Sequence, residues 1–149
     1  MTALLCTPLS DLERSLLNHF YKQHGSRMRA ASEGELWVAR SGEVIAGLSL
    51  SPVAEGYWLT GLLVAPQWRN QGVAARLVEA ALAQVDGCTW LFCHPDLERF
   101  YQRLGFATAC GLPEALASRL ARYQRSKRLV AMARGQSSVA SKPGNSTSV

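Results

Sequence analysis

The residues best suited to chemistry lie between Val64 and Leu77, where the sequence VAPQWRNQGVAARL joins a strand pattern to a helix pattern. The first N–H groups of a helix have no intrahelical acceptor and carry the positive end of the helix dipole, so such a junction attracts anions. Gly72 and Ala74 would let a phosphate approach the backbone, and Arg69 would add a positive charge. The junction therefore predicts a site for a phosphorylated ligand, with an ordinary strand-to-helix turn as the alternative.

Two flanking elements must hold this junction in place. Upstream, Tyr57–Val64 is rich in strand-forming residues, and its isolated Gly61 predicts a bulge or a close backbone neighbour. Downstream, apolar residues recur at helical spacing, which predicts a helix after Gly72. The residues that mark the buried face of this helix are Ala74, Leu77, Val78, Ala81, Leu82 and Val85.

Two motifs resemble one known family. The pattern R-x-x-G-x-A that follows the V-x-P strand end is similar to the pyrophosphate loop of the GNAT superfamily of acyl-CoA-dependent N-acyltransferases. The segment FYQRLGF, Phe100–Phe106, follows about thirty residues later and resembles the F-Y-x-x-x-G-F segment of the same family. The resemblance covers Leu36–Phe106. It implies an α/β fold in which helices flank a central twisted, mostly antiparallel sheet with one splayed parallel strand pair.

The resemblance also implies the ligand and its binding residues. Acetyl-CoA would be the cosubstrate, with its pyrophosphate on the loop and its pantetheine arm on the backbone of the bulged strand. The expected cofactor-binding residues are Leu62, Leu63, Val64, Arg69, Asn70, Gln71, Gly72, Val73, Ala74, Ala75, His94 and Tyr101.

The expected catalytic residues are Tyr101 and His94. By the resemblance, Tyr101 matches the family's frequent tyrosine acid and would protonate the departing CoA thiolate. A phenol can supply this proton at a modest cost in free energy. A packing role for Tyr101 is the alternative. A backbone N–H of Leu63 or Val64 would polarise the thioester carbonyl. His94 stands where many members have an asparagine, so it could bind cofactor, take a proton through water, or cap the following helix. Glu55 or a water chain is the other possible base.

These motifs predict an N-acetyltransferase that moves an acetyl group directly from acetyl-CoA to a primary amine of a small molecule. An acyl-CoA-binding regulator without turnover and a protein or peptide N-acetyltransferase are the alternatives. By the resemblance, residues 20–28 and 110–129 build the acceptor pocket, and they offer Tyr21, His24, Tyr123 and several arginines. A cluster of cations suits an acceptor that bears a carboxylate or a phosphate.

Length and composition predict one domain, because the 149 residues are 48% hydrophobic. We expect this domain to span residues 1–134 and the Gly/Ser-rich residues 135–149 to form a disordered tail. No apolar run is long enough to cross a bilayer and the first residues are no secretory signal, so we expect a cytoplasmic protein without membrane contact. The 4 cysteines are scattered without a C-x-x-C pair, so neither a disulfide framework nor a metal site is expected.

The net charge of +5 is a property of the C-terminal part, which holds seven basic residues and one acidic residue from Cys110 onwards. A solvated face explains Arg119–Arg128 better than a nucleic-acid-binding module, because no aromatic residues interleave with the cations in a binding motif. We therefore expect no nucleic-acid partner. A homodimer is left open.

Further patterns complete the predicted domain. The capping-box pair Ser10 and Glu13 opens a helix that ends at Gly25, and a hairpin turns at Ser41–Gly42. Leu12, Leu16, Leu17 and Phe20 are expected on the core face of this first helix. Other strands are predicted at Ala3–Cys6, Cys88–Cys93, Phe106–Ala109 and Arg128–Ala133, and other helices at Asp96–Leu104 and Pro113–Gln124.

Overall fold

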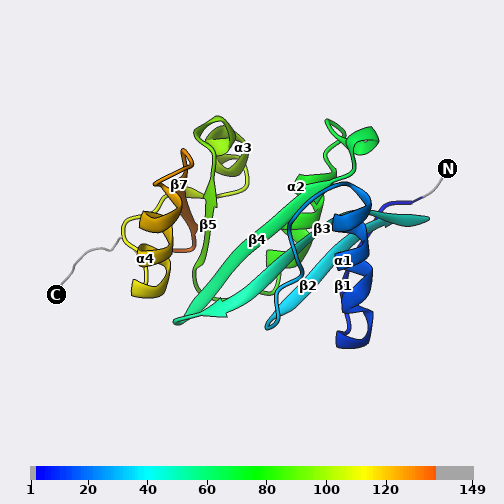
Figure 1. The fold of residues 1–149 in the computed structure, drawn as a ribbon, viewed down its shortest axis with the longest axis horizontal. Coiled ribbons are helices and arrows are strands. Elements are labelled where there is room, and N and C mark those ends of the chain that lie inside the picture. The colour runs from blue at the N-terminus through cyan, green and yellow to red at the C-terminus, as the bar shows by residue number, and fades with distance from the viewer. Residues whose placement is uncertain (1–2, 137–149) are drawn as a thin grey trace. The chain divides into compact units, whose positions relative to one another are not determined.

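The computed structural model describes residues 3–136. Along the chain the elements are β1 (Leu5–Leu9), α1 (Arg14–Gln23), β2 (Glu35–Ser41), β3 (Glu43–Val53), β4 (Gly56–Val64), α2 (Val73–Leu82), β5 (Thr89–Cys93), α3 (Glu98–Gln102), β6 (Ala107–Thr108), α4 (Glu114–Tyr123) and β7 (Val130–Arg134) (Figure 1). Single turns of 3-10 helix stand at Asp11–Glu13, Pro66–Trp68 and Pro95–Leu97.

The seven strands form one mixed sheet in the order β1-β2-β3-β4-β5-β7-β6. β1 with β2, β2 with β3, β5 with β7 and β6 with β7 are antiparallel. β4 and β5 are parallel, and their ladder pairs Tyr57 with Thr89 and Trp58 with Trp90. The predicted mostly antiparallel sheet with one parallel pair is therefore confirmed.

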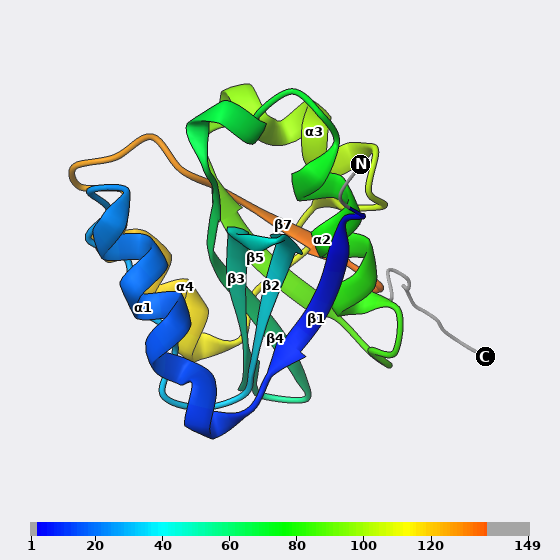
Figure 2. The same cartoon turned by 90° about the vertical axis from the view of Figure 1, so that its right-hand side faces the viewer.

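The chain divides into two compact units. The N-terminal unit consists of the described residues up to Pro52 together with Leu59–Val85. In it, α1 and α2 lie on opposite faces of the β1–β3 sheet (Figures 1 and 2). Leu17, Phe20 and Tyr21 of α1 are completely or almost completely buried against β2, so this helix is anchored by a narrow apolar stripe.

The C-terminal unit consists of Val53–Trp58 and the residues from Asp86 onwards. Its core holds Trp90 of β5, Leu116 of α4 and Ala133 of β7, which are all buried. The ring of Trp58 also faces Phe92 at a centroid distance of 5.6 Å. This packing fixes β5, and with it the start of the segment that carries His94 and Tyr101.

The local predictions for the first helix are confirmed in part. Ser10 and Glu13 form the predicted capping box, but the box opens the 3-10 turn and α1 begins at Arg14. Leu17 and Phe20 are buried as expected, whereas Leu12 is 95% exposed and Leu16 is 38% exposed. The prediction for Leu12 is wrong because Leu12 lies in the 3-10 turn, whose angular spacing differs from that of an α-helix. Leu16 lies within α1 at the edge of the apolar stripe formed by Leu17, Phe20 and Tyr21, so it is only partly covered.

Several element boundaries differ from the predicted ones. The first strand spans Leu5–Leu9 rather than Ala3–Cys6, and it pairs residue by residue with β2 from Leu5 opposite Arg40 to Leu9 opposite Leu36. Partner pairing rather than local composition therefore decides where this strand lies. β6 covers only Ala107–Thr108 of the predicted Phe106–Ala109. The hairpin turn at Gly42 is confirmed, since β2 ends at Ser41 and β3 begins at Glu43.

The predicted tail lies almost wholly outside the described residues, so that prediction stays a prediction. Gln136, the last described residue, accepts a hydrogen bond from the N–H of Cys110 and donates one to the carbonyl of Gly111. Among residues 3–136, no helix is long and apolar enough to cross a membrane.

Candidate functional site

In the N-terminal unit, the backbone of β4 is bent at Gly61, which has a φ of 68°. The hydroxyl of Tyr21 donates a hydrogen bond to the Gly61 carbonyl at 2.5 Å. A Cβ atom added to Gly61 would stand 2.5 Å from that hydroxyl oxygen, so a side chain is excluded on steric grounds as well as by φ. The predicted close neighbour of Gly61 is therefore Tyr21 of α1.

Tyr21 is completely buried, and this burial raises the pKa of its hydroxyl above the ordinary value. Its side chain therefore supports β4 and does not line an acceptor pocket, contrary to the expectation drawn from its position in residues 20–28. The signal for burial was present in the sequence, because Leu17, Phe20 and Tyr21 share one face of a helix.

The residues Leu62–Val64 follow the bend and are half-buried at the end of β4. The chain leaves the strand at Ala65, whose N–H donates to the carbonyl of Ile45 in β3 at 2.8 Å. The Nε of Arg69 donates to the carbonyl of Val64 at 3.1 Å. This arginine is thus folded back onto the strand end, and its terminal N–H groups make no hydrogen bond to another described residue, which leaves them for an anion.

The turn between β4 and α2 needs two residues with positive φ, and the sequence supplies an asparagine and a glycine. Asn70 has a φ of 63° and Gly72 a φ of 77°. The side-chain amide of Gln71 donates to the carbonyl of Gln67 at 2.9 Å, which closes the turn on itself. Asn and Gly are the residues that tolerate this left-handed conformation best.

The N-terminus of α2 has the features that an anion site requires. Its first intrahelical bond runs from the N–H of Arg76 to the carbonyl of Gly72, and no side chain caps the helix. The N–H groups of Val73, Ala74 and Ala75 therefore have no acceptor among the described residues. A Cβ atom on Gly72 would meet nothing within 4 Å, so the approach to these groups is open.

In the C-terminal unit, α3 carries Tyr101 in an aromatic cluster. Its ring lies 4.9 Å from that of Phe100 and 5.7 Å from that of Phe106, in both cases edge to face. Its carbonyl accepts the N–H groups of Leu104 and Phe106, so the turn at Gly105 closes around it. Tyr101 is only 6% exposed, and the position of its ring is therefore fixed by packing.

Burial, and to a lesser extent the nearby Cys93, raises the pKa of Tyr101 to about 12. The phenol is therefore fully protonated at neutral pH, which suits a proton donor and excludes a phenolate base. The hydroxyl makes no hydrogen bond to another described residue. Its proton is thus not committed to a structural contact.

His94 ends β5 and takes the capping role, which was one of its three possible roles. Its Nδ1 accepts the backbone N–H of Asp96 at 3.1 Å and so caps the turn that Pro95 begins. When Nδ1 accepts, the neutral imidazole carries its proton on Nε2, which makes Nε2 a donor and not a base. The ring is exposed, so this donor faces solvent.

The sequence offered Glu55 as the other candidate base. Glu55 is an exposed residue in the turn before β4 and forms no ion pair with another described residue. Among residues 3–136, no group of three or more His, Cys, Asp or Glu side chains is placed to hold a metal ion.

A model of the family described as "Acetyltransferase (GNAT) domain" matches residues 32–108, which is more than half of the chain. The chain belongs to the GNAT acetyltransferase family. The matched range contains the β4–α2 junction of the N-terminal unit as well as His94 and Tyr101 of the C-terminal unit. No curated protein sequence matches the chain.

Solved structures show that the sheet and its helices form the GNAT fold. Ard1 from Thermoplasma volcanium is 19% identical with a TM-score of 0.64, and the match covers 89% of this chain and 97% of that one. ElaA from Escherichia coli is 16% identical with a TM-score of 0.63, over 90% of this chain and 99% of that one.

A longer relative was solved with ligands. N-acetylglutamate synthase from Neisseria gonorrhoeae, complexed with coenzyme A and L-arginine, is 16% identical with a TM-score of 0.64. The match covers 91% of this chain but 34% of that one, so the chain spans about a third of that protein. At these identities the likeness concerns the fold alone.

Proposed function

We propose that this GNAT protein transfers an acetyl group from acetyl-CoA to a primary amine of a small molecule, by direct transfer in a ternary complex. The observation that carries the proposal is the N-terminus of α2, where the N–H groups of Val73, Ala74 and Ala75 have no acceptor within residues 3–136 and a Cβ atom on Gly72 would meet nothing within 4 Å. Such a terminus accepts a pyrophosphate without a side-chain ligand, because backbone dipoles and N–H donors supply the attraction. Arg69 adds a positive charge at the same turn.

The transfer requires one bond to form and one to break. The amine nitrogen attacks the thioester carbonyl carbon, and the carbon–sulfur bond then breaks to release the CoA thiolate. A backbone N–H of Leu63 or Val64 would stabilise the oxyanion formed in between. Tyr101 donates its proton to the thiolate and is reprotonated from solvent.

The proton of the attacking amine leaves to water in this proposal. His94 has its Nδ1 engaged with the N–H of Asp96, so the side chain acts through its Nε2 donor, which would contact the cosubstrate. Glu55 sits in an exposed turn and is given no role. Water as the base requires no further residue, and the sequence offers only His94 and Glu55 as candidate bases.

Two measurements test the proposal together. Calorimetry should show binding of acetyl-CoA, and a screen of small amines should show CoA release that depends on both the amine and the protein. Desulfo-CoA compounds are a matched control, because they retain the pyrophosphate but cannot transfer an acetyl group. Binding without release on any amine would favour a regulatory acyl-CoA-binding protein, and absence of binding would overturn the proposal.

A further inference from the structure

A chain of buried hydrogen bonds crosses the N-terminal unit and ends at the bend in β4. The hydroxyl of Tyr21 donates to the Gly61 carbonyl at 2.5 Å. Ser49 of β3 is completely buried, and the N–H of Ala31 donates to its hydroxyl oxygen at 3.1 Å. Burial raises the pKa of Tyr21, and a hydrogen bond with Ser49 acts in the opposite direction. Because the Tyr21 proton is already donated to Gly61, Ser49 is the donor in that bond.

These four residues, Ala31, Ser49, Tyr21 and Gly61, form a relay in which every donor points the same way. Each hydroxyl accepts a hydrogen bond from the preceding member and donates one to the next, so the bonds polarise and strengthen one another. A buried hydroxyl costs free energy unless it is hydrogen-bonded. Each member of the relay therefore depends on the others, and the loss of one hydroxyl leaves its neighbours with an unmatched donor or acceptor.

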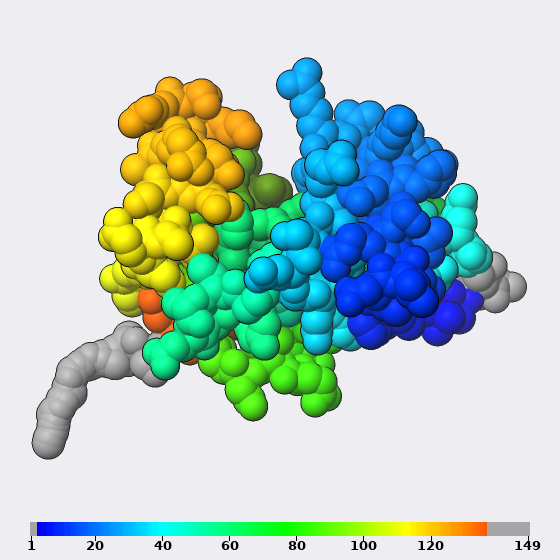
Figure 3. All heavy atoms as spheres, turned by 60° about the horizontal axis from the view of Figure 1, so that its bottom comes forward, coloured from blue at the N-terminus to red at the C-terminus, as the bar shows by residue number. Residues whose placement is uncertain are grey.

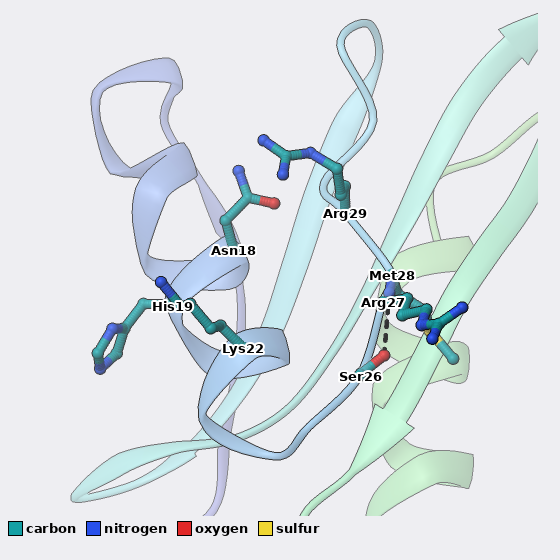
Figure 4. A pocket seen from close by; sticks show the side chains of 7 residues that line it. All are labelled: Asn18, His19, Lys22, Ser26, Arg27, Met28 and Arg29. Carbon is teal, nitrogen blue, oxygen red and sulfur yellow. Dashed lines mark hydrogen bonds between the residues drawn. The ribbon is translucent and has the colours of Figure 1, made fainter.

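The first member of the relay lies in the loop that follows α1, which Figure 3 shows in light blue at the surface of its unit. Arg14 donates to the carbonyl of Ala31, and the carboxamide oxygen of Asn18 accepts the N–H of Ala30 at 2.7 Å. A hollow of about 440 Å³ lies between α1 and residues 26–29 of the loop (Figure 4). The two hydrogen bonds therefore hold Ala31 in place although the loop does not pack closely on α1 there.

The last member of the relay fixes the orientation of one peptide plane. The bond between Gly61 and Leu62 is trans, so the Gly61 carbonyl and the Leu62 N–H point in opposite directions. A glycine can turn this plane in several ways at little cost, because it has no side chain to clash with the backbone. The hydroxyl of Tyr21 selects one of these orientations by holding the carbonyl, and the Leu62 N–H consequently points away from Tyr21.

This peptide plane begins the segment Leu62–Val64, on which the proposed transfer depends. At the far end of the segment, the N–H of Ala65 donates to the carbonyl of Ile45 at 2.8 Å. At its near end, Tyr21 holds the Gly61 carbonyl. The described ladder between β4 and β5 includes only Tyr57 and Trp58 of β4, so no pairing with β5 directs the N–H groups of the segment. The orientation set at Gly61 is therefore carried into these three residues.

We infer that the relay is a positioning device for the transfer step. Tyr21, itself held by Ser49, fixes the peptide plane at Gly61 and with it the backbone N–H that stabilises the oxyanion. The inference rests on the proposed acetyl transfer and adds two positioning residues to it. Both act through the backbone of β4 and neither touches the reacting atoms.

Kinetics separates positioning from stability. In Tyr21→Phe, kcat should fall at least about tenfold, because a misdirected oxyanion donor loses part of its effect. The Kd of acetyl-CoA should change far less, since its pyrophosphate is expected at α2. The control is Val38→Ala, which removes buried contacts from the same cluster and leaves the relay intact. An unchanged kcat in Tyr21→Phe, or an equal fall in both variants under conditions where both are folded, would overturn the inference.

A second variant tests whether Ser49 acts through Tyr21. Ser49→Ala should lower kcat by a smaller factor, about threefold, because the Tyr21 hydroxyl keeps its bond to Gly61 but loses its own donor. The double variant Tyr21→Phe/Ser49→Ala should be no slower than Tyr21→Phe, because the relay is already broken. Losses that multiply in the double variant would show that the two hydroxyls act independently and would overturn the relay.

An infrared measurement tests the inference without turnover. Acetyl-CoA with an isotopic label at the thioester carbonyl is bound in the absence of an amine, and the spectrum with unlabelled acetyl-CoA is subtracted. A hydrogen bond polarises the carbonyl and lowers its stretching frequency. The frequency should therefore be higher in Tyr21→Phe than in the wild type, with a smaller rise in Ser49→Ala and none in Val38→Ala.

The same measurement distinguishes two kinds of failure. Acetyl-CoA that binds with one and the same carbonyl frequency in the wild type and in Tyr21→Phe would overturn the positioning role and leave the proposed function standing. Absence of acetyl-CoA binding by the wild type would overturn both.

Discussion

The N-terminus of α2 and the ring of Tyr101 provide their chemistry in opposite ways. The first consists of backbone N–H groups next to Gly72 that no side chain caps. The second is one hydroxyl on a side chain that is 6% exposed and held between Phe100 and Phe106. A site of backbone groups tolerates many substitutions but depends on a glycine, whereas a site made of one buried side chain depends on a single oxygen atom.

The largest expected effect comes from removing that oxygen atom. Tyr101→Phe should lower the turnover number by about 10², because the packing is retained and the proton donor is lost. The affinity for acetyl-CoA should barely change. Steady-state kinetics measures the turnover number, and calorimetry measures the affinity. The control is Tyr57→Phe, which removes the same hydroxyl group from a half-buried tyrosine of β4. Full activity of Tyr101→Phe would end the assignment of a general acid.

A smaller effect is expected from blocking the backbone site. Gly72→Glu should weaken acetyl-CoA binding at least about tenfold, or about 1.4 kcal/mol, because a carboxylate would stand where the pyrophosphate is expected. Gly42→Glu is the matched control, since Gly42 has a φ of 82° and open space around a Cβ atom, but lies in a hairpin turn. Both positions have a similar positive φ that strains a side chain, so a difference between the affinities of the two variants supports the assignment. Equal affinity in the two would remove it.

The backbone site of the N-terminal unit lies next to β4, which the side chain of Tyr21 holds at Gly61. Removing the Tyr21 hydroxyl tests whether that side chain is needed for stability and for binding. Tyr21→Phe should lower the free energy of unfolding by about 1–2 kcal/mol, because it leaves the half-buried Gly61 carbonyl without its donor. Chemical denaturation measures this change, with Tyr57→Phe as the reference. If the acetyl-CoA affinity also falls, the bend at Gly61 is needed for binding; an unchanged stability would contradict the structural role.

The smallest effect is expected from pH. Because the pKa of Tyr101 is raised to about 12, the proton donor should persist across pH 7–9, and backbone N–H groups do not titrate there. Turnover limited by this acid should therefore not fall in that range. Above pH 10 the unfolded phenol loses its proton before the folded one, so stability should decrease as pH rises from about 10 through about 12. A loss of the acid with a midpoint below pH 9 would be inconsistent with Tyr101.

The sequence predicted the elements that rest on local chemistry. The capping pair Ser10 and Glu13, the turn at Gly42 and the start of a helix after Gly72 follow from residues that cap a helix or that permit a tight turn. The sequence predicted less well the features that depend on contacts with other elements. The exposure of Leu12 and the exact span of β1 depend on a 3-10 turn and on pairing with β2, which no local pattern contains.

The candidate site divides in the same way. The two motifs placed Gly72 at a helix N-terminus and Tyr101 on a short helix, because turn and cap preferences act over a few residues. Only the tertiary structure showed that Tyr21 supports Gly61 and that Met28 stands beside it, since these contacts join residues far apart in sequence. Contacts of this kind arise from close packing of a folded chain, in which the partner of each atom is set by shape and volume rather than by sequence distance.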